Sequence, residues 1–301
     1  MIGLPTLRAQ AALLVLFAAG CGREDAAAQV VVGVTTDLAV GFDIRRVETT
    51  TKIDGVVTHS ESLSYDTGAL SLPTELVVEP AQDGAAIELA VAAFRDGDAS
   101  PLVTRRAATR AVSGRSLLLL VSLDKACSAA TCEPGATCVK GACVNPFLAP
   151  SALADHDPRW IASAPDACKT PSSGAPAVVI GHGEDAFAAL DESEVVSIEA
   201  GPQGGHHVWL ALRVNGLRQM GSHLTVRGHF PELAHDLPPF TSGVTLRRAG
   251  DDRCEIYGVR FQVDQGLSVE AVRGRTLDIE VALEDPNGDV ATAMKRVAIA
   301  P

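Results

Sequence analysis

Short runs of β-forming residues, separated by turn signals, recur along almost the whole chain, and no long amphipathic helical pattern interrupts them. The alternation is clearest from Ile87 to Phe94, where the odd-numbered residues put an apolar side chain on one face of an extended strand as far as Ala93. Asp-Gly dipeptides at 54–55 and 96–97 favour hairpin turns between such runs. The runs of this part are VVVGVTT, DIRRVETTT, ELVVEP, AIELAVAAF and SLLLLVSL. They predict an antiparallel β-sandwich over residues 30–125.

A second series of β-type runs fills the C-terminal part of the chain. The last two are joined by Asp285-Pro286-Asn287-Gly288, and Asn-Gly is the strongest short hairpin signal. The runs are VVSIEAG, HHVWLALRV, SHLTVRGHF, GVTLRRA, IYGVRFQVD, TLDIEVALED and ATAMKRVAIA. We therefore expect a second sandwich over residues 178–301. The predicted fold class is all-β, with two antiparallel β-sandwich domains that are immunoglobulin-like in the broad architectural sense.

The first twenty residues have the features of a secretory signal: a positive charge at Arg8, an apolar core and small residues before Cys21. Such a segment is too short to be a stable membrane anchor. The run LFAAGC resembles the lipobox of bacterial lipoproteins, although Ala18 stands where Leu is usual. The resemblance implies a lipoprotein signal peptide at 1–20, lipid attachment at Cys21 and a tether at 21–29. The alternative is an ordinary signal peptide cut near the same residues, with Cys21 a free thiol or a disulfide partner.

Six further cysteines form an even set, which in an exported chain indicates disulfides rather than metal ligands. Four of them lie in CSAATCEPGATCVKGAC, a module at 126–145 with almost no apolar residues to bury, so that disulfides must hold its shape. Six prolines then mark residues 146–177 as an extended linker or a wrapped loop. We expect its cysteine to be joined to the second sandwich. The six cysteines are Cys127, Cys132, Cys138, Cys143, Cys168 and Cys254, and the expected link is Cys168 with Cys254.

The segment CEPGATCVKGAC resembles a fragment of an EGF-like module. Four cysteines allow three pairings. The resemblance implies the interleaved one, Cys127 with Cys138 and Cys132 with Cys143. A zinc site is the competing interpretation, but the module has no CxxC pair and no nearby histidine.

Charge and motifs exclude several classes of function. Without Arg8 the chain has 24 basic and 37 acidic residues, a net charge of 24 − 37 = −13. It offers no basic cluster to a nucleic acid, and an acidic surface is repelled by anionic lipid headgroups. No later segment reaches the roughly 18 apolar residues of a membrane-spanning helix. Because G-x-S-x-G and H-E-x-x-H motifs are absent and the carboxylates near Glu184 and Asp191 fall in turn-rich sequence, we expect neither an enzyme nor a cofactor.

Six of the eight histidines lie between His182 and His235, which raises the possibility of a metal site. His206 and His207 are neighbours in a strand, so they point to opposite faces and cannot share an ion. If the strand 206–214 pairs with the strand 222–230 through a loop at 215–221, His207 lies opposite His229. His182 or Glu184 would then be the third ligand for copper or zinc.

The alternative places His207 and His229 at a solvated surface, with Trp209 in cation-π contact with Arg227. The metal site also fails to form if the two strands belong to different sheets. The glycines of GPQGG open a strand rather than a helix, so they indicate a tight turn and not a phosphate cradle.

Most of the chain resembles a group of lipoproteins found in myxobacteria and related Gram-negative bacteria. The residues that carry this resemblance are LFAAGC, CEPGATCVKGAC and GEDAFAALDESEVVSIEAGPQGGHHVWLALRVNGL. The resemblance implies a location and an architecture rather than an activity. We expect a non-enzymatic outer-membrane lipoprotein, held to the membrane by its N-terminal lipid, whose β domains present a binding or structural surface to an envelope partner. The residue after Cys21 is Gly22 and not the Asp that favours inner-membrane retention in some bacteria, which favours the outer membrane.

Overall fold

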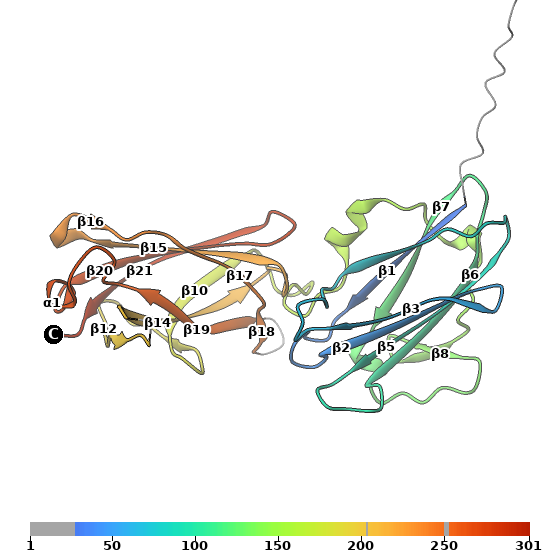
Figure 1. Ribbon diagram of the computed structural model, residues 1–301, viewed down its shortest axis with the longest axis horizontal. Helices are drawn as coiled ribbons and strands as arrows, with labels where there is room; N and C mark the ends of the chain where they lie inside the picture. Colours follow the sequence, from blue (N-terminus) through green and yellow to red (C-terminus); the bar gives the residue numbers. More distant parts are fainter. Residues whose placement is uncertain (1–27, 203, 250–252) are drawn as a thin grey trace, which may run out of the picture.

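The computed structural model describes residues 28–202, 204–249 and 253–301. Two β-sandwiches follow one another along the longest axis of the molecule (Figure 1). The predicted all-β class with two sandwiches is therefore confirmed. The predicted signal peptide, Cys21 and all but the last two residues of the predicted tether lie outside the described residues.

The first sandwich contains seven strands in two sheets. They are β1 (Gln29–Thr36), β2 (Arg46–Ile53), β3 (Val56–Ser64), β4 (Thr74–Val78), β5 (Ala86–Phe94), β6 (Val103–Arg110) and β7 (Ser116–Leu123). One sheet has the order β4–β1–β7 and the other has the order β3–β2–β5–β6. The predicted turn at Asp54-Gly55 joins β2 to β3, and both of its residues have the positive φ that a two-residue hairpin requires. Fully buried side chains such as Val30, Ile87 and Leu117 fill the space between the sheets.

Strand β1 differs from the antiparallel pairing that we predicted, because it pairs in parallel with β7. A strand with this pairing is usually covered on both faces, and all of β1 after Gln29 is buried. This explains why VVVGVTT is continuously apolar instead of alternating. A second parallel pair joins Val195–Val196 to the last strand of the chain. The named strands therefore pair antiparallel, as predicted, except for these two pairs.

The second sandwich consists of the remaining long strands and several two-residue strands. They are β10 (Ala177–His182), β11 (Ala188–Ala189), β12 (Val195–Val196), β13 (Glu199–Ala200), β14 (His206–Asn215), β15 (Ser222–Phe230), β16 (His235–Asp236), β17 (Phe240–Val244), β18 (Arg247–Arg248), β19 (Cys254–Gln262), β20 (Thr276–Glu284) and β21 (Val290–Ile299). One sheet has the order β11–β10–β14–β19–β18, with β13 beside β14. The other has the order β12–β21–β20–β15–β16, with β17 beside β15.

The core of the second sandwich follows the alternation of its strands. Alternation predicts that the apolar residues of β14 and β15 face inward, and these residues are buried, those of β15 coming from the facing sheet. They are Val208, Leu210, Leu212 and Val214 in β14, and Leu224, Val226 and Phe230 in β15. The turn at 285–288 joins β20 to β21 as predicted, with Glu284 opposite Val290.

The helical segments are short: η1 (Lys125–Cys127), η2 (Pro150–Ala152), η3 (Pro158–Ser163), η4 (Pro231–Leu233) and α1 (Val269–Val272). Within the described ranges, none of them has the length and apolar character needed to cross a membrane.

The cysteine-rich module is a small unit beside β6. Its strands β8 (Thr137–Val139) and β9 (Ala142–Val144) form a hairpin. Disulfides join Cys127 to Cys138 and Cys132 to Cys143, so the interleaved pairing is confirmed. The bond between Cys168 and Cys254 is also present.

The proline-rich segment wraps around the first sandwich, and we call residues 146–168 the strap. Its backbone extends two sheet edges. The N–H of Ala108 in β6 donates to the carbonyl of Pro146 at 2.8 Å, and the N–H of Leu118 in β7 donates to that of Ala154 at 2.9 Å. Trp160 then lies on β1 above Gly33, where a Cβ atom would come within 2.7 Å of the indole ring. The strap is therefore an outer layer of the first sandwich and not a free spacer.

Candidate functional site

A polar pocket of about 370 Å³ opens where the Gly201 loop meets the start of β14. The turn is closed by a hydrogen bond from the N–H of Gly201 to the carbonyl of Gly205 at 2.9 Å. Gly204 and Gly205 both have positive φ. These glycines serve a tight turn, as predicted. The described residues that line the pocket are Gly201, Pro202, Gly204, Gly205, His206, His207, Phe240, Arg260, Gln262 and Gln265.

His206 is fixed in this pocket by Asp264, which follows β19. Its Nδ1 lies 2.8 Å from Oδ2 of Asp264, and its backbone N–H donates to Oδ1 at 3.0 Å. Burial raises the pKa of Asp264, but the hydrogen bonds from His206 and from the Gln262 amide lower it by more, so the net shift is downward. Gly205 must lie close to the side chain of Gln262, because a Cβ atom at Gly205 would lie 2.4 Å from Nε2 of Gln262. The loop, the histidine and the carboxylate thus form one preorganised unit.

His207 is only 7% exposed and packs edge-on against Trp209, with ring centroids 4.7 Å apart. The Arg260 guanidinium lies 4.9 Å from the Trp209 ring, and the indole N–H donates to Glu199 at 3.0 Å. The predicted contact between Trp209 and Arg227 is therefore wrong. Trp209 pairs across β14 and β19 instead.

Arg227 lies in the facing sheet, where its Nη1 is 3.8 Å from Oε1 of Glu280. The predicted solvated position of His207 is wrong as well, because β13 runs beside β14 at this point and places Glu199 opposite His207.

The metal site that the histidines suggested does not form. His207 belongs to β14 and His229 to β15, and these strands lie in different sheets. His229 contacts Asp236 at 2.7 Å, whereas His182 lies 3.4 Å from Glu194. No group of three metal-ligating side chains is found in the described part of the chain.

His207 and His229 are kept apart by the path of the loop that follows β14. Leu217, Arg218 and Gln219 are all buried, and the chain crosses from one sheet to the other instead of turning back as a hairpin. The alternation of β14 and β15 predicts which side chains face inward, but it is the same for two strands of one sheet and for two strands that face each other.

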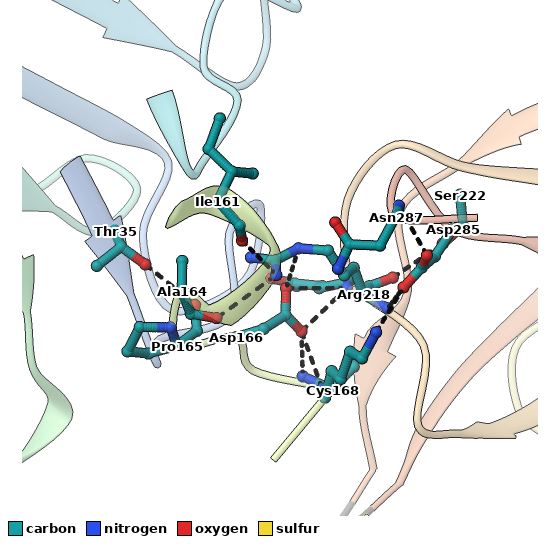
Figure 2. Close-up of polar contacts among 12 residues, drawn as sticks. Thr35, Ile161, Ala164, Pro165, Asp166, Cys168, Arg218, Ser222, Asp285 and Asn287 are labelled. Atoms are coloured by element: carbon teal, nitrogen blue, oxygen red, sulfur yellow. Dashed lines mark hydrogen bonds and ion pairs between the residues drawn. The ribbon is translucent and has the colours of Figure 1, made fainter. Parts of the chain in front are cut away.

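The buried residues of this crossing loop form a joint between the two sandwiches (Figure 2). The side-chain amide of Gln219 bonds to both backbone groups of Val40 in the first sandwich, accepting from its N–H at 3.0 Å and donating to its carbonyl at 3.1 Å. The same amide nitrogen lies 3.0 Å from the carbonyl of Leu246 in the second sandwich. One side chain therefore ties together three segments.

An ion pair lies beside it in the joint. Arg218 and Asp166 are both buried, with Nε of the guanidinium 3.7 Å from Oδ2 of the carboxylate. Asp166 also accepts the backbone N–H groups of Cys168 at 2.7 Å and Gln219 at 3.1 Å. Nη1 of Arg218 donates to the carbonyl of Ile161 in the strap at 3.0 Å. The strap and the crossing loop are thus held by paired buried charges, which are costly to separate.

A second ion pair closes the joint on the side of the β20–β21 turn. Nζ of Lys169 lies 3.3 Å from Asp285, whose side chain is fully buried, and also contacts Asp289. Burial lowers the pKa of Lys169, but the two carboxylates raise it by more, so the net shift is upward. The N–H of Arg218 donates to Asp285 at 3.2 Å and links the two ion pairs.

Sequence reasoning missed the residues that make this joint. Arg218 and Gln219 stand in a stretch that has the composition of an exposed loop, and Asp166 stands among prolines. Asp264, the partner of His206, is 58 residues away and follows a β-type run without any distinguishing motif. Only the register of β14 against β19 brings it into place.

No protein-family model matches this chain, and no curated protein does. Solved structures with a weak likeness include part of a 1.5-MDa bacterial ice-binding adhesin at 9% identity, with a TM-score of 0.22, over 91% of this chain and 65% of that one. A Bacteroides uniformis β-glucuronidase matches at 10% identity with a TM-score of 0.21, over 87% of this chain and 25% of that one. The N-terminal domain of PorA matches at 19% identity with a TM-score of 0.17, over 40% of this chain and 96% of that one. Scores at this level assign neither a family nor an activity.

Proposed function

We propose that this protein is a non-enzymatic, lipid-anchored protein of the bacterial cell envelope. In this proposal the two sandwiches act as one rod, and the rod holds the pocket at His206 away from the membrane for binding an envelope partner. The observation that carries the proposal is the joint, in which Gln219 of the second sandwich completes the hydrogen bonds of Val40 in the first.

The course of the strands supports this arrangement. β1 runs from Gln29 at the far side of the first sandwich toward the joint, and Thr35 donates to the carbonyl of Pro165 near its end (Figure 1). β14 continues on the other side of the joint and has His206 at its distant end. At about 3.3 Å per residue, these strands span roughly 25 Å and 30 Å. A lipid attached through Cys21 and the pocket would lie at opposite ends.

The chemistry of the pocket favours binding over catalysis. Its described lining contains His206 and His207, an arginine and two glutamines, but no serine, threonine, cysteine or tyrosine, and Asp264 holds His206 from beside the pocket. A histidine held by a carboxylate can activate a hydroxyl or thiol side chain as a nucleophile, and the described lining offers none. Here the same groups are placed to exchange hydrogen bonds with a polar ligand.

The experiment that tests the anchor is metabolic labelling of cells that express the full chain. The wild-type protein is expected to incorporate labelled palmitate and to sediment with the membranes. Cys21→Ser is expected to lose both properties. Ala27→Ser, in the same tether, is the matched control and should behave like the wild type. Unchanged labelling of Cys21→Ser would overturn the lipid anchor.

The rod is tested separately by placing spin labels on the two sandwiches, at Val77 and at Met294. Both side chains are at least half exposed, so labelling should leave the fold intact. A single narrow distance distribution is expected. A broad distribution would show that the sandwiches move independently and would contradict the rod.

A further inference from the structure

The strand β3 is the longest strand at a sheet edge in the described part of the molecule, with nine residues. The other long edges of the first sandwich are occupied. The strap bonds to β6 through Ala108 and to β7 through Leu118. The remaining outermost strands have at most five residues, and in the second sandwich β12 and β18 cover the long strands β21 and β19 over two residues each. A long uncovered edge is a template for pairing with another strand.

The direction of the backbone groups in β3 follows from its pairing with β2. The N–H of Tyr65 donates to the carbonyl of Arg45 directly opposite at 2.8 Å. Hydrogen-bonded and non-bonded pairs alternate along an antiparallel ladder. His59 and Glu61 therefore bond toward β2 in the same way. Ser60 and Ser62 turn their N–H and carbonyl groups outward, away from the sheet.

We propose that β3 pairs antiparallel with β3 of a second copy of this chain, about a two-fold axis at Ser60. In this register the two Ser60 residues exchange two backbone hydrogen bonds. His59 of each copy lies opposite Glu61 of the other, on one face of the joined sheet. Within one chain Nε2 of His59 already lies 3.5 Å from Oε2 of Glu61, and both side chains are nearly half exposed, so in the dimer each carboxylate can contact the imidazoles of both copies. With His59 protonated, this register places opposite charges directly across the strand pair, which stabilises it.

The neighbouring registers are disfavoured by the same side chains. An axis at Glu61 places the two Glu61 carboxylates opposite each other, and an axis at His59 does the same for the imidazoles. An axis at Ser62 places Glu61 opposite Leu63. The sequence THSESLS is therefore self-complementary in one register only, and charge selects that register.

The pairing is short. An irregularity between Thr51 and Lys52 leaves Thr58 as an extra residue in β3, and the regular register ends there. A bulge of this kind limits how far an edge strand can be extended. We therefore expect a weak dimer that forms at high protein concentration, because the buried area is well below that of a stable complex, about 1,200 Å² or more.

The test uses the mature chain carrying Cys21→Ser, so that lipid does not affect the result. In Ser60→Cys the two new thiols face each other across the axis, where the Cα atoms of a hydrogen-bonded pair are about 5.5 Å apart, a distance that suits a disulfide. Ser62→Cys is the matched control, since it faces Thr58 of the other copy. Under mild oxidation, the cross-linked dimer of Ser60→Cys is expected to form at least tenfold faster. Equal rates, or faster linkage of Ser62→Cys, would overturn the register.

Sedimentation equilibrium then tests the interaction without a cross-link. Ser60→Pro removes an N–H that points outward and so leaves the β2–β3 ladder intact. It is expected to weaken dimerisation at least tenfold, whereas Ser60→Ala is not. Glu61→His alone should weaken the dimer, and adding His59→Glu should restore it. A wild-type chain that stays monomeric at millimolar concentration, or a swapped pair that fails to restore the dimer, would overturn the proposal.

Discussion

The side-chain amide of Gln219 replaces a missing strand partner for Val40, bonding both of its backbone groups across a sequence separation of 179 residues. Both residues are buried, so water does not compete for these groups. A single side chain therefore satisfies a donor and an acceptor that would otherwise be left unpaired at the junction of two domains.

Gln219→Leu is expected to destabilise the protein by about 1–3 kcal/mol, because it leaves the N–H and carbonyl of Val40 without partners. Urea denaturation measures the loss. Gln82→Leu is the control, since Gln82 is exposed and its side chain takes no part in the joint. Equal stability of the two variants would contradict the role given to Gln219.

Asp166→Ala is expected to cost about 3–5 kcal/mol, because it leaves the buried guanidinium of Arg218 without its carboxylate. Asp157→Ala is the comparison within the same strap. Its ion pair with Arg159 is exposed to solvent, so its removal is expected to change the stability much less than the loss of Asp166. Thermal unfolding of both variants provides the measurement, and a similar small effect in both would contradict a buried ion pair.

Gly33→Ala is expected to loosen the strap, because the new methyl group would meet the Trp160 ring at 2.7 Å. Overpacking of this kind costs about 1–3 kcal/mol. Gly243→Ala, in β17, adds the same group where no atom lies within 4 Å. Limited proteolysis of the strap should become faster in the first variant only. Unchanged proteolysis of Gly33→Ala would show that Trp160 does not hold the strap.

Acid is expected to weaken the strap through Glu75, which accepts from the Trp160 indole at 2.5 Å and contacts His156 at 2.8 Å. Burial raises the pKa of Glu75, but these hydrogen bonds lower it by more, and the net shift is downward. A carboxyl group with a lowered folded-state pKa stabilises the fold above its unfolded value, about 4.3, and this contribution is lost as the pH falls through the folded-state pKa.

The measurement is thermal stability against pH, with Trp160 fluorescence recorded in a Trp209→Phe background. Glu75→Gln cannot titrate, so its stability should depend less on pH below about 4.3 than that of the parent. Parallel curves for the two proteins would contradict the assignment to Glu75.

Alternation and turn chemistry predict the fold well where a strand has one buried face. They identify the inward residues of β14 and the turn at Asp54-Gly55, and the composition of the module at 126–145 indicates disulfides. They fail for β3, because an edge strand with the sequence VVTHSESLS has little apolar surface to reveal it. They also fail to say that β1 and β7 are parallel, since pairing direction depends on the whole chain.

The candidate site was harder to predict than the fold. The strand around His206 and His207 is predicted correctly, but the partners of both residues are set by long-range register. Asp264 reaches His206 because β19 lies beside β14, whereas His229 is carried into the other sheet. A cluster of histidines in sequence therefore gave no reliable information on which of them meet in space.

Because of the strap, the two sandwiches depend on each other for their cover and their disulfide, so we expect evolution to exchange them together. Residues 146–156 extend two edges of the first sandwich, while Cys168 at the end of the strap is bonded to Cys254 in the second. A recombination event between the sandwiches would separate the first sandwich from the residues that extend its edges, or the second sandwich from its disulfide partner Cys168. The segment from 28 to 301 is thus expected to pass between genomes as one exchangeable block, in contrast to sandwich domains joined by free linkers.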